Sequence, residues 1–260
     1  MPEAAGLAYK QRNGGAAAVG RPPLVLIHGA GGTRLHWPPM LRRLPDADVY
    51  AVDLPGHGEA PGAGQATIAG YRQAIEAWMQ ALALPPAVIM GHSMGGALAL
   101  SLALEAQARV AGLVLVGTGA RLRVHPLLLE ASRAGGVPAE TLATLVSWWY
   151  SPEASARLRE LAARGLAATN ASVLHGDFLA CDGFDVMDRL GAIDRPALVI
   201  VGEDDHMTPT KYAHFLAEHL PRARLEVIPA AGHMVMLEQA AAVEGVLRAW
   251  LDDTFPATGP

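Results

Sequence analysis

A serine stands among small residues in the segment VIMGHSMGGALAL. The apolar, β-type run 87–90 precedes this serine, and the Ala- and Leu-rich run 97–103, which has helical character, follows it. A strand that passes directly into a helix needs a sharp turn, whose apex residue is strained and whose neighbours must be small. Gly91 and Gly95 lie two residues before and after Ser93, which is the spacing of a nucleophile elbow, G-x-S-x-G. The sequence therefore predicts a strand–turn–helix unit with Ser93 at its apex.

Short apolar runs alternate with helical patterns along most of the chain. Continuous apolar runs are typical of strands that are buried on both faces of a parallel sheet. These runs cover residues 24–27, 49–52, 88–90, 113–116, 198–201 and 225–228. Helices are expected between them, at about 66–83, 95–107, 209–220 and 236–251. This order predicts a doubly wound α/β fold, in which ligands bind beyond the carboxyl ends of the strands.

One long stretch, residues 119–190, contains no convincing β-type run. Helical patterns fill it instead, at 126–134, 139–150, 152–165 and 166–180. An apolar stripe at helical spacing runs along the second of them, formed by Leu142, Leu145, Val146 and Trp149. We therefore predict a helical cap, residues 119–190, inserted into an α/β core that consists of residues 1–118 and 191–260.

The composition of the 260-residue chain, with 51% hydrophobic and 17% charged residues, is ordinary for a globular protein. The formal net charge is −5 and the charges are interspersed, so no basic patch indicates a nucleic-acid partner. No apolar run is long enough to span a membrane, and the N-terminal stretch lacks the apolar segment of a signal peptide. Cys181 is the single cysteine, which excludes an intrachain disulfide. We expect a cytoplasmic protein without nucleic-acid or membrane partners; its oligomeric state, monomer or dimer, is left open.

A serine hydroxyl is a weak nucleophile until a base removes its proton, and the base in turn needs an acid to orient it. In proteins with this elbow, the chain order is serine, acid, histidine. Two late strands are followed by segments that supply the acid and the base, VGEDDHMTP at 201–209 and PAAGHM at 229–234. Asp205 is the candidate acid and His233 the candidate base, with Asp204 as the rival acid.

The candidate oxyanion hole needs two backbone N–H groups near the serine. A glycine-rich turn, HGAGG at 28–32, follows the first strong strand, and such a turn lets N–H groups point into a cavity. We expect one donor to be the N–H of Ala30 and the other to be the N–H of Met94, the residue after the serine. One such donor typically stabilises the transition state by about 2.7–4 kcal/mol.

Five motifs occur in a fixed order along the chain: HGAGG (28–32), DLPGHG (53–58), GHSMGG (91–96), VGEDDHMTP (201–209) and AGHMVMLEQ (231–239). In this order they resemble the serine-nucleophile esterase branch of the α/β-hydrolase family, from about residue 7 to residue 251. The resemblance implies a mostly parallel eight-stranded sheet flanked by helices, with a helical cap inserted after the sixth strand. It also implies a triad of Ser93, Asp205 and His233, and it places His28 and His57 in turns that shape the pocket floor.

We expect neither a metal nor a cofactor. The histidines show no metal-ligand spacing such as H-E-x-x-H. The glycine-rich turn at 28–32 does not match the dinucleotide fingerprint, because Arg34 occupies the position of its last small residue.

The serine suits acyl chemistry, whereas the related haloalkane dehalogenases and epoxide hydrolases carry an aspartate at the elbow. The leading hypothesis is a carboxylic ester hydrolase that acts on small or medium esters and forms an acyl-enzyme. The alternatives left open are a carbon–carbon hydrolase of vinylogous diketones, a lactonase, a thioesterase, and a cofactor-free haloperoxidase or perhydrolase. A ligand-binding protein on a hydrolase scaffold is the hypothesis from a different class, because one fold hosts many functions.

Overall fold

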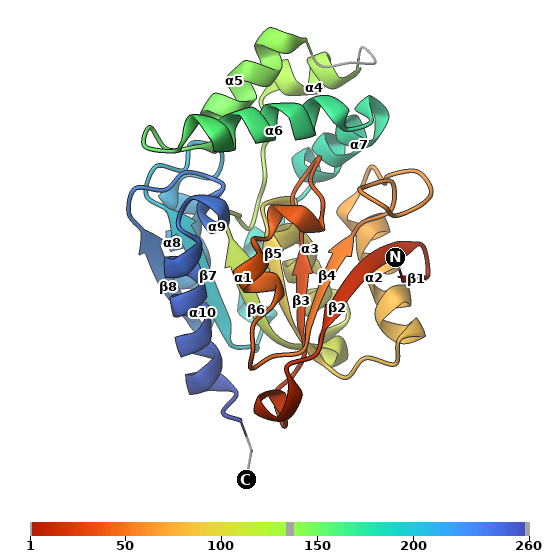
Figure 1. Cartoon of the computed structure of the whole chain (residues 1–260), viewed down its shortest axis with the longest axis vertical. Coiled ribbons are helices and arrows are strands. Elements are labelled where there is room, and N and C mark those ends of the chain that lie inside the picture. The colour runs from red at the N-terminus through yellow and green to blue at the C-terminus, as the bar shows by residue number, and fades with distance from the viewer. Residues whose placement is uncertain (1, 134–137, 258–260) are drawn as a thin grey trace.

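The computed structural model describes residues 2–133 and 138–257, and its centre is an eight-stranded sheet (Figure 1). The strand order across the sheet is β1-β2-β4-β3-β5-β6-β7-β8. The β1–β2 and β2–β4 pairs are antiparallel and the remaining pairs are parallel. The strands are Glu3–Ala4 (β1), Leu7–Arg12 (β2), Leu24–Ile27 (β3), Val49–Asp53 (β4), Ala87–His92 (β5), Val110–Val116 (β6), Ala197–Gly202 (β7) and Ala223–Ile228 (β8). The predicted α/β-hydrolase sheet is thereby confirmed.

Helices cover both faces of the sheet. In β3, Val25 and Ile27 belong to one apolar cluster, whereas Leu24 and Leu26 belong to the other. Helices α2, α3 and α8 pack on the first face, and α1 and α10 pack on the second. The core helices are Pro39–Arg42 (α1), Ile68–Ala81 (α2), Met94–Glu105 (α3), Thr210–His219 (α8), Val235–Glu238 (α9) and Ala240–Thr254 (α10). Short 3-10 helices span Gly15–Ala18, Arg34–His36, Gln107–Arg109 and Met187–Ala192.

Several core elements, β1 and α1 among them, differ from those predicted by the local patterns. Strand β2 was not among those runs because its second half, KQR, is polar and largely exposed, as is common where an antiparallel strand lies near the edge of a sheet. The helix predicted at 236–251 is two helices, α9 and α10, divided at Gln239. The φ of Gln239 is −126°, outside the helical range, and its side chain donates to the carbonyl of Ala230.

The insertion between β6 and β7 is helical and lies over the carboxyl ends of the strands (Figure 1), which confirms the predicted insertion after the sixth strand. Its helices are Pro126–Arg133 (α4), Ala139–Trp149 (α5), Ala156–Ala168 (α6) and Ala171–Asp182 (α7). Helix α6 runs through Gly165, where a boundary was predicted, because the caps stand at Ser155 before α6 and at Asn170 before α7. Residue 134, the predicted end of the first cap helix, lies outside the described residues. The limits 119 and 190 of the cap stay a prediction.

Among the described residues, no helix is both long and apolar enough to cross a membrane.

Candidate active site

Ser93 lies between β5 and α3, and the positions two residues before and after it leave room only for glycine. Its φ and ψ are 53° and −115°, a backbone conformation that residues other than glycine rarely adopt. A Cβ atom on Gly91 would lie 2.0 Å from the carbonyl oxygen of Gly95, and one on Gly95 would lie 2.3 Å from that of Ile27. The N–H of Ser93 donates to the carbonyl of Val116 at 2.9 Å. The close approach of strand and helix therefore explains both glycines of the elbow.

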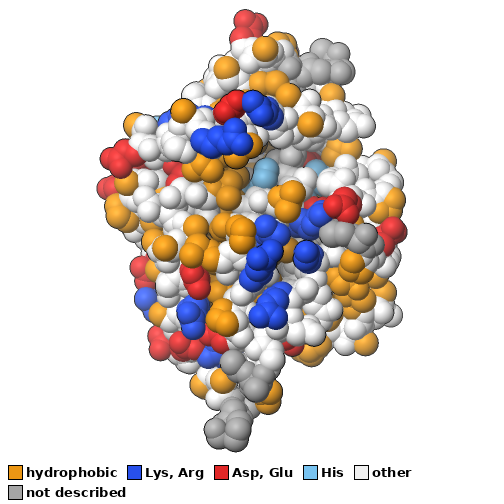
Figure 2. Space-filling model, viewed as in Figure 1, with side chains coloured by type: hydrophobic (Ala, Val, Ile, Leu, Met, Phe, Trp, Pro, Cys, Tyr) orange, Lys and Arg blue, Asp and Glu red, His pale blue; other side chains and the backbone are white. Residues whose placement is uncertain are grey.

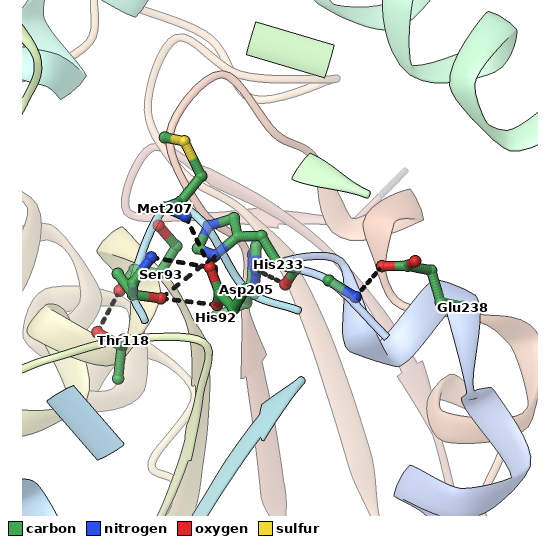
Figure 3. Close-up of polar contacts among 9 residues, drawn as sticks. His92, Ser93, Thr118, Asp205, Met207, His233 and Glu238 are labelled. Atoms are coloured by element: carbon green, nitrogen blue, oxygen red, sulfur yellow. Dashed lines mark hydrogen bonds and ion pairs between the residues drawn. The ribbon is translucent and has the colours of Figure 1, made fainter. Parts of the chain in front are cut away.

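Asp205 and His233 meet at the ends of β7 and β8, beside Ser93 (Figure 3). Nδ1 of His233 lies 2.9 Å from Oδ2 of Asp205, and both side chains are buried. Thr208 donates to Asp205 through its backbone N–H and through its hydroxyl, each at 2.8 Å. The rival acid, Asp204, makes no side-chain hydrogen bond or ion pair among the described residues. The structure thus brings Asp205, and not Asp204, to His233.

The loop that carries His233 is attached to the cap. One carboxylate oxygen of Glu238 accepts from the N–H of Gly232 and the other accepts from the N–H of Ser151, both at 2.9 Å. The N–H of Met234 also donates to the carbonyl of Trp149 at 3.0 Å. The loop and the segment after α5 therefore hold each other in place.

His92, the last residue of β5, lies against His233. The two ring centroids are 4.6 Å apart, and Nε2 of His92 donates to the carbonyl of His233 at 2.9 Å. Burial lowers the pKa of His92 well below its ordinary value, so the ring is neutral. His92 thus supports the backbone of the candidate base.

Ser93 and His233 line the same cavity, but among the hydrogen bonds of the described residues none joins Oγ of Ser93 to His233. With its Nδ1–H donating to Asp205, the ring of His233 leaves Nε2 as the acceptor. Catalytic hydrogen bonds are often long in free enzymes and shorten when the substrate binds. The arrangement is therefore compatible with proton transfer from Ser93 to His233 once a substrate is present.

The turn 28–32 holds the candidate donor Ala30 in a defined orientation. The carbonyl of Gly29 accepts from Nδ1 of His28 at 2.8 Å and from the N–H of Gly32 at 3.0 Å. Because the C=O and N–H of a trans peptide point in opposite directions, these two bonds direct the N–H of Ala30 away from them. The turn packs on the elbow, since a Cβ on Gly29 would lie 3.1 Å from Cβ of Ser93. Met94, the other candidate, is the first residue of α3, where N–H groups have no acceptor within the helix.

A cavity of about 490 Å³ opens between the cap and the core. Figure 2 shows a hollow there, with histidine side chains inside it. Its lining is mostly apolar and comes from both the core and the cap: Gly29, Ala30, His36, His92, Ser93, Leu122, Arg123, Val124, His125, Pro126, Leu128, Trp148, Trp149, Phe178, Cys181, His206, Met207, Thr208, His233 and Met234. Burial lowers the pKa of His36 to about 4 and raises that of the Cys181 thiol, so both side chains are neutral.

His28 and His57 are buried behind the turn, with ring centroids 4.8 Å apart. Nε2 of His57 lies 2.8 Å from a carboxylate oxygen of Asp177, which comes from the cap helix α7. Neither Asp177 nor Glu238 was singled out from the sequence. The one signal for Asp177 is its place among apolar residues in VLHGDFLAC, where a solvent-facing charge is not expected. Within the described chain, no group of three or more His, Cys, Asp or Glu side chains is placed to bind a metal ion.

Comparison with known proteins extends over both the core and the insertion. A family model described as "Alpha/beta hydrolase family" matches residues 24–246. The pimeloyl-[acyl-carrier protein] methyl ester esterase of Neisseria meningitidis serogroup C is 31% identical over 240 residues, which cover 87% of this chain and 92% of that protein. The structure of a thermophilic esterase is 33% identical, with a TM-score of 0.81 and coverage of 95% of this chain and 94% of that one. An esterase from Thermogutta terrifontis, with malate bound, is 25% identical, with a TM-score of 0.82 and coverage of 96% and 94%.

Proposed function

Since the chain belongs to the alpha/beta hydrolase family and is an esterase-type hydrolase, we propose that it cleaves small-to-medium carboxylic esters with a triad of Ser93, His233 and Asp205. One observation carries this proposal. Asp205 holds Nδ1 of His233, while His233 and Ser93 both face one cavity. The cavity volume of about 490 Å³ lies within the range of small-molecule sites.

In the proposed first half-reaction, Nε2 of His233 removes the proton of Ser93, and Oγ attacks the ester carbonyl carbon. The N–H groups of Ala30 and Met94 bind the oxyanion that forms. His233 then gives its proton to the leaving alcohol, the ester C–O bond breaks, and Ser93 carries the acyl group. Asp205 keeps the proton on Nδ1 and stabilises the imidazolium.

In the second half-reaction, His233 removes a proton from water, and the resulting hydroxide oxygen attacks the acyl-enzyme. The same two backbone N–H groups bind the second oxyanion. When it collapses, Oγ of Ser93 leaves and takes the proton from His233, so the carboxylic acid is released and the protein returns to its starting state. The ester and one water molecule supply every atom that these steps consume.

The test is steady-state hydrolysis of p-nitrophenyl acetate and butyrate by the wild type and by Ser93→Ala. We expect many turnovers for the wild type and a decrease in kcat of about 10³- to 10⁶-fold for the variant, because it lacks the nucleophile. Ser147→Ala is the matched control, since Ser147 is exposed on α5 and donates only to the carbonyl of Thr144. Its activity should equal that of the wild type.

Three other outcomes would change the substrate class, the nucleophile or the class of protein. If the wild type is inactive on esters but cleaves a lactone, a thioester or a vinylogous diketone, and Ser93→Ala does not, the substrate class is wrong and the nucleophile is right. Equal activity of the wild type and Ser93→Ala would contradict the role of Ser93. Saturable binding of these compounds without turnover would favour a ligand-binding protein.

A further inference from the structure

Asp177 is a carboxylate buried at the contact between the cap and the core. It belongs to α7, and none of its surface is exposed. It accepts hydrogen bonds from the N–H of Gly31 at 2.8 Å, from Nε2 of His57 at 2.8 Å and from the hydroxyl of Tyr71 at 2.5 Å. One cap side chain therefore contacts the loop after β3, the loop after β4 and helix α2. A buried carboxylate is destabilising unless it is paired, and here each of its oxygens has a donor.

His57 provides the counter-charge for Asp177. The second ring nitrogen of His57, Nδ1, lies 3.1 Å from the carbonyl oxygen of Pro55. Both contacts are to oxygens that only accept, so the ring satisfies both when each nitrogen carries a proton. Burial lowers the pKa of His57, but the hydrogen bond and the charge of Asp177 raise it, and the net pKa lies above the ordinary value. Geometry and charge together favour an imidazolium–carboxylate pair.

Gly31 is bound by the cap at both of its backbone polar groups. Its N–H donates to Asp177, and its carbonyl accepts from the hydroxyl of Thr169, which follows α6, at 3.1 Å. Its φ of +62° favours glycine, and a Cβ there would lie 2.9 Å from the side chain of Leu174 in α7. The cap thus covers this residue closely and binds it from two sides.

The turn that contains Gly31 is of a kind that can adopt two forms. Gly31 is the third residue of the turn 29–32, which the N–H of Gly32 closes on the carbonyl of Gly29. A β-turn with positive φ at its third residue is of the type II kind, and rotation of its central peptide gives the type I kind. The central peptide joins Ala30 to Gly31, so the acceptor at Asp177 selects the observed form. Rotation of that peptide changes ψ of Ala30 but not its φ, so it does not by itself turn the N–H of Ala30. It does release the turn from Asp177, and the turn as a whole, which lies beside Ser93 in the cavity wall, can then shift.

We propose that Asp177 is a positioning residue for the oxyanion hole, through which the docking of α7 on the core determines the conformation of the turn 29–32. The proposal rests on the proposed function through the role given to the N–H of Ala30. Asp177 is not among the residues that line the cavity, so it acts through Gly31 and not on the substrate. Its neighbours Phe178 and Cys181 do line the cavity. The same helix therefore forms part of the substrate wall and sets the oxyanion turn.

The experiment compares Asp177→Ala with the wild-type protein by two measurements. Hydrogen–deuterium exchange of peptides that cover residues 24–37 reports the turn without reference to catalysis. Hydrolysis of p-nitrophenyl butyrate reports kcat and KM separately. We expect faster exchange in the turn and a decrease in kcat of about 10- to 100-fold, with KM changed by less than about threefold, because a misplaced donor weakens binding of the transition state and not of the substrate.

Three further variants separate positioning from general stability. Asp177→Asn keeps an oxygen for Gly31 and can turn its amide toward Tyr71, so it should restore most of kcat. Thr169→Val keeps the shape of Thr169 and removes the other cap contact to Gly31, so it tests the same coupling if Asp177→Ala does not fold. Tyr71→Phe removes a hydrogen bond to Asp177 without touching the turn, and it should lower kcat less than Asp177→Ala does.

Unchanged exchange in residues 24–37 together with unchanged kcat, in Asp177→Ala or in Thr169→Val, would overturn the proposal. An equal loss of kcat in Tyr71→Phe would also overturn it, because the effect would then be general destabilisation. If the wild type cleaves no ester, the proposed function fails. The exchange data still decide whether Asp177 holds the turn.

Discussion

At the scale of single residues, the acid is the most tightly held group of the candidate triad. Oδ1 of Asp205 accepts from the N–H groups of Met207 and Thr208, at 2.9 and 2.8 Å. Oδ2 accepts from the hydroxyl of Thr208 and from Nδ1 of His233, at 2.8 and 2.9 Å. All of these partners are donors, so the loop after β7 is built for a group that only accepts.

Asp205→Asn should therefore decrease kcat by about 10³- to 10⁴-fold at neutral pH while the protein stays folded. The amide oxygen would face the two backbone N–H groups, and its NH₂ group would face Nδ1 of His233. His233 would then have to accept at Nδ1 and carry its proton on Nε2, where it could not take the proton of Ser93. The measurement is ester hydrolysis, with a thermal melt of the same sample.

The control for this substitution is Asp204→Asn, because Asp204 is the neighbour in sequence and makes no contact with His233. We expect its kcat to stay within about twofold of the wild type, as is usual for a substitution away from any special contact. A large loss in Asp204→Asn with little loss in Asp205→Asn would show that the acid has been assigned to the wrong residue.

At the scale of elements, the elbow depends on the contact between α3 and β3. Gly95→Ala would place a Cβ 2.3 Å from the carbonyl oxygen of Ile27 and 2.7 Å from that of His28, and neither backbone atom can move without shifting β3. We expect this substitution to lower the free energy of unfolding by about 3 kcal/mol or more. Urea denaturation at equilibrium measures the change.

Gly245→Ala is the matched control for this substitution. Gly245 lies in α10, is exposed, and has open space around the position of a Cβ. Alanine is the better helix former, so the free energy of unfolding should rise by about 0.5–1 kcal/mol. If both substitutions changed the free energy of unfolding equally, the close contact at Gly95 would not be what restricts this position to glycine.

The elements that could be predicted from the sequence are those with a local pattern. The buried parallel strands are continuous apolar runs, and the elbow follows one of them, so both are visible without a partner segment. Strand β2 is not visible in this way, because its polar half owes its place to pairing with β4. The start of α6 at Ala156 depends on a cap at Ser155 that hydrophobic periodicity does not report.

The residues of the candidate site can likewise be predicted from the sequence only where a local motif contains them. Ser93, Asp205 and His233 stand in short motifs at strand ends, so their types and order suffice to select them. Asp177 contacts Gly31, which is 146 residues away in the chain, and His92 contacts the backbone of His233, which is 141 residues away. No local spacing encodes such contacts, so the groups that hold the turn and the base emerge only from the folded structure.

At the scale of the whole molecule, the charge around the cavity differs from the charge of the chain. The chain has a formal net charge of −5, yet the lining of the cavity includes Arg123 and no Asp or Glu. Figure 2 shows further Lys and Arg side chains gathered on the core beside the hollow. Charges of one sign around a cleft attract ligands of the opposite sign and repel ligands of the same sign.

We therefore expect a cationic ester to be a poorer substrate than its neutral isostere. For butyrylcholine, kcat/KM should be about 10-fold lower at low salt than for its neutral isostere, 3,3-dimethylbutyl butyrate. This difference in kcat/KM should become smaller as ionic strength rises. A pH-stat that records acid release measures the hydrolysis of both substrates. Arg123→Gln should reduce the difference in kcat/KM between them, as added salt does.

The rings of Trp148 and Trp149, which line the same cavity, would have the opposite effect if they attracted the quaternary ammonium. Butyrylcholine turning over as well as its isostere would show that this attraction outweighs the repulsion by the basic groups.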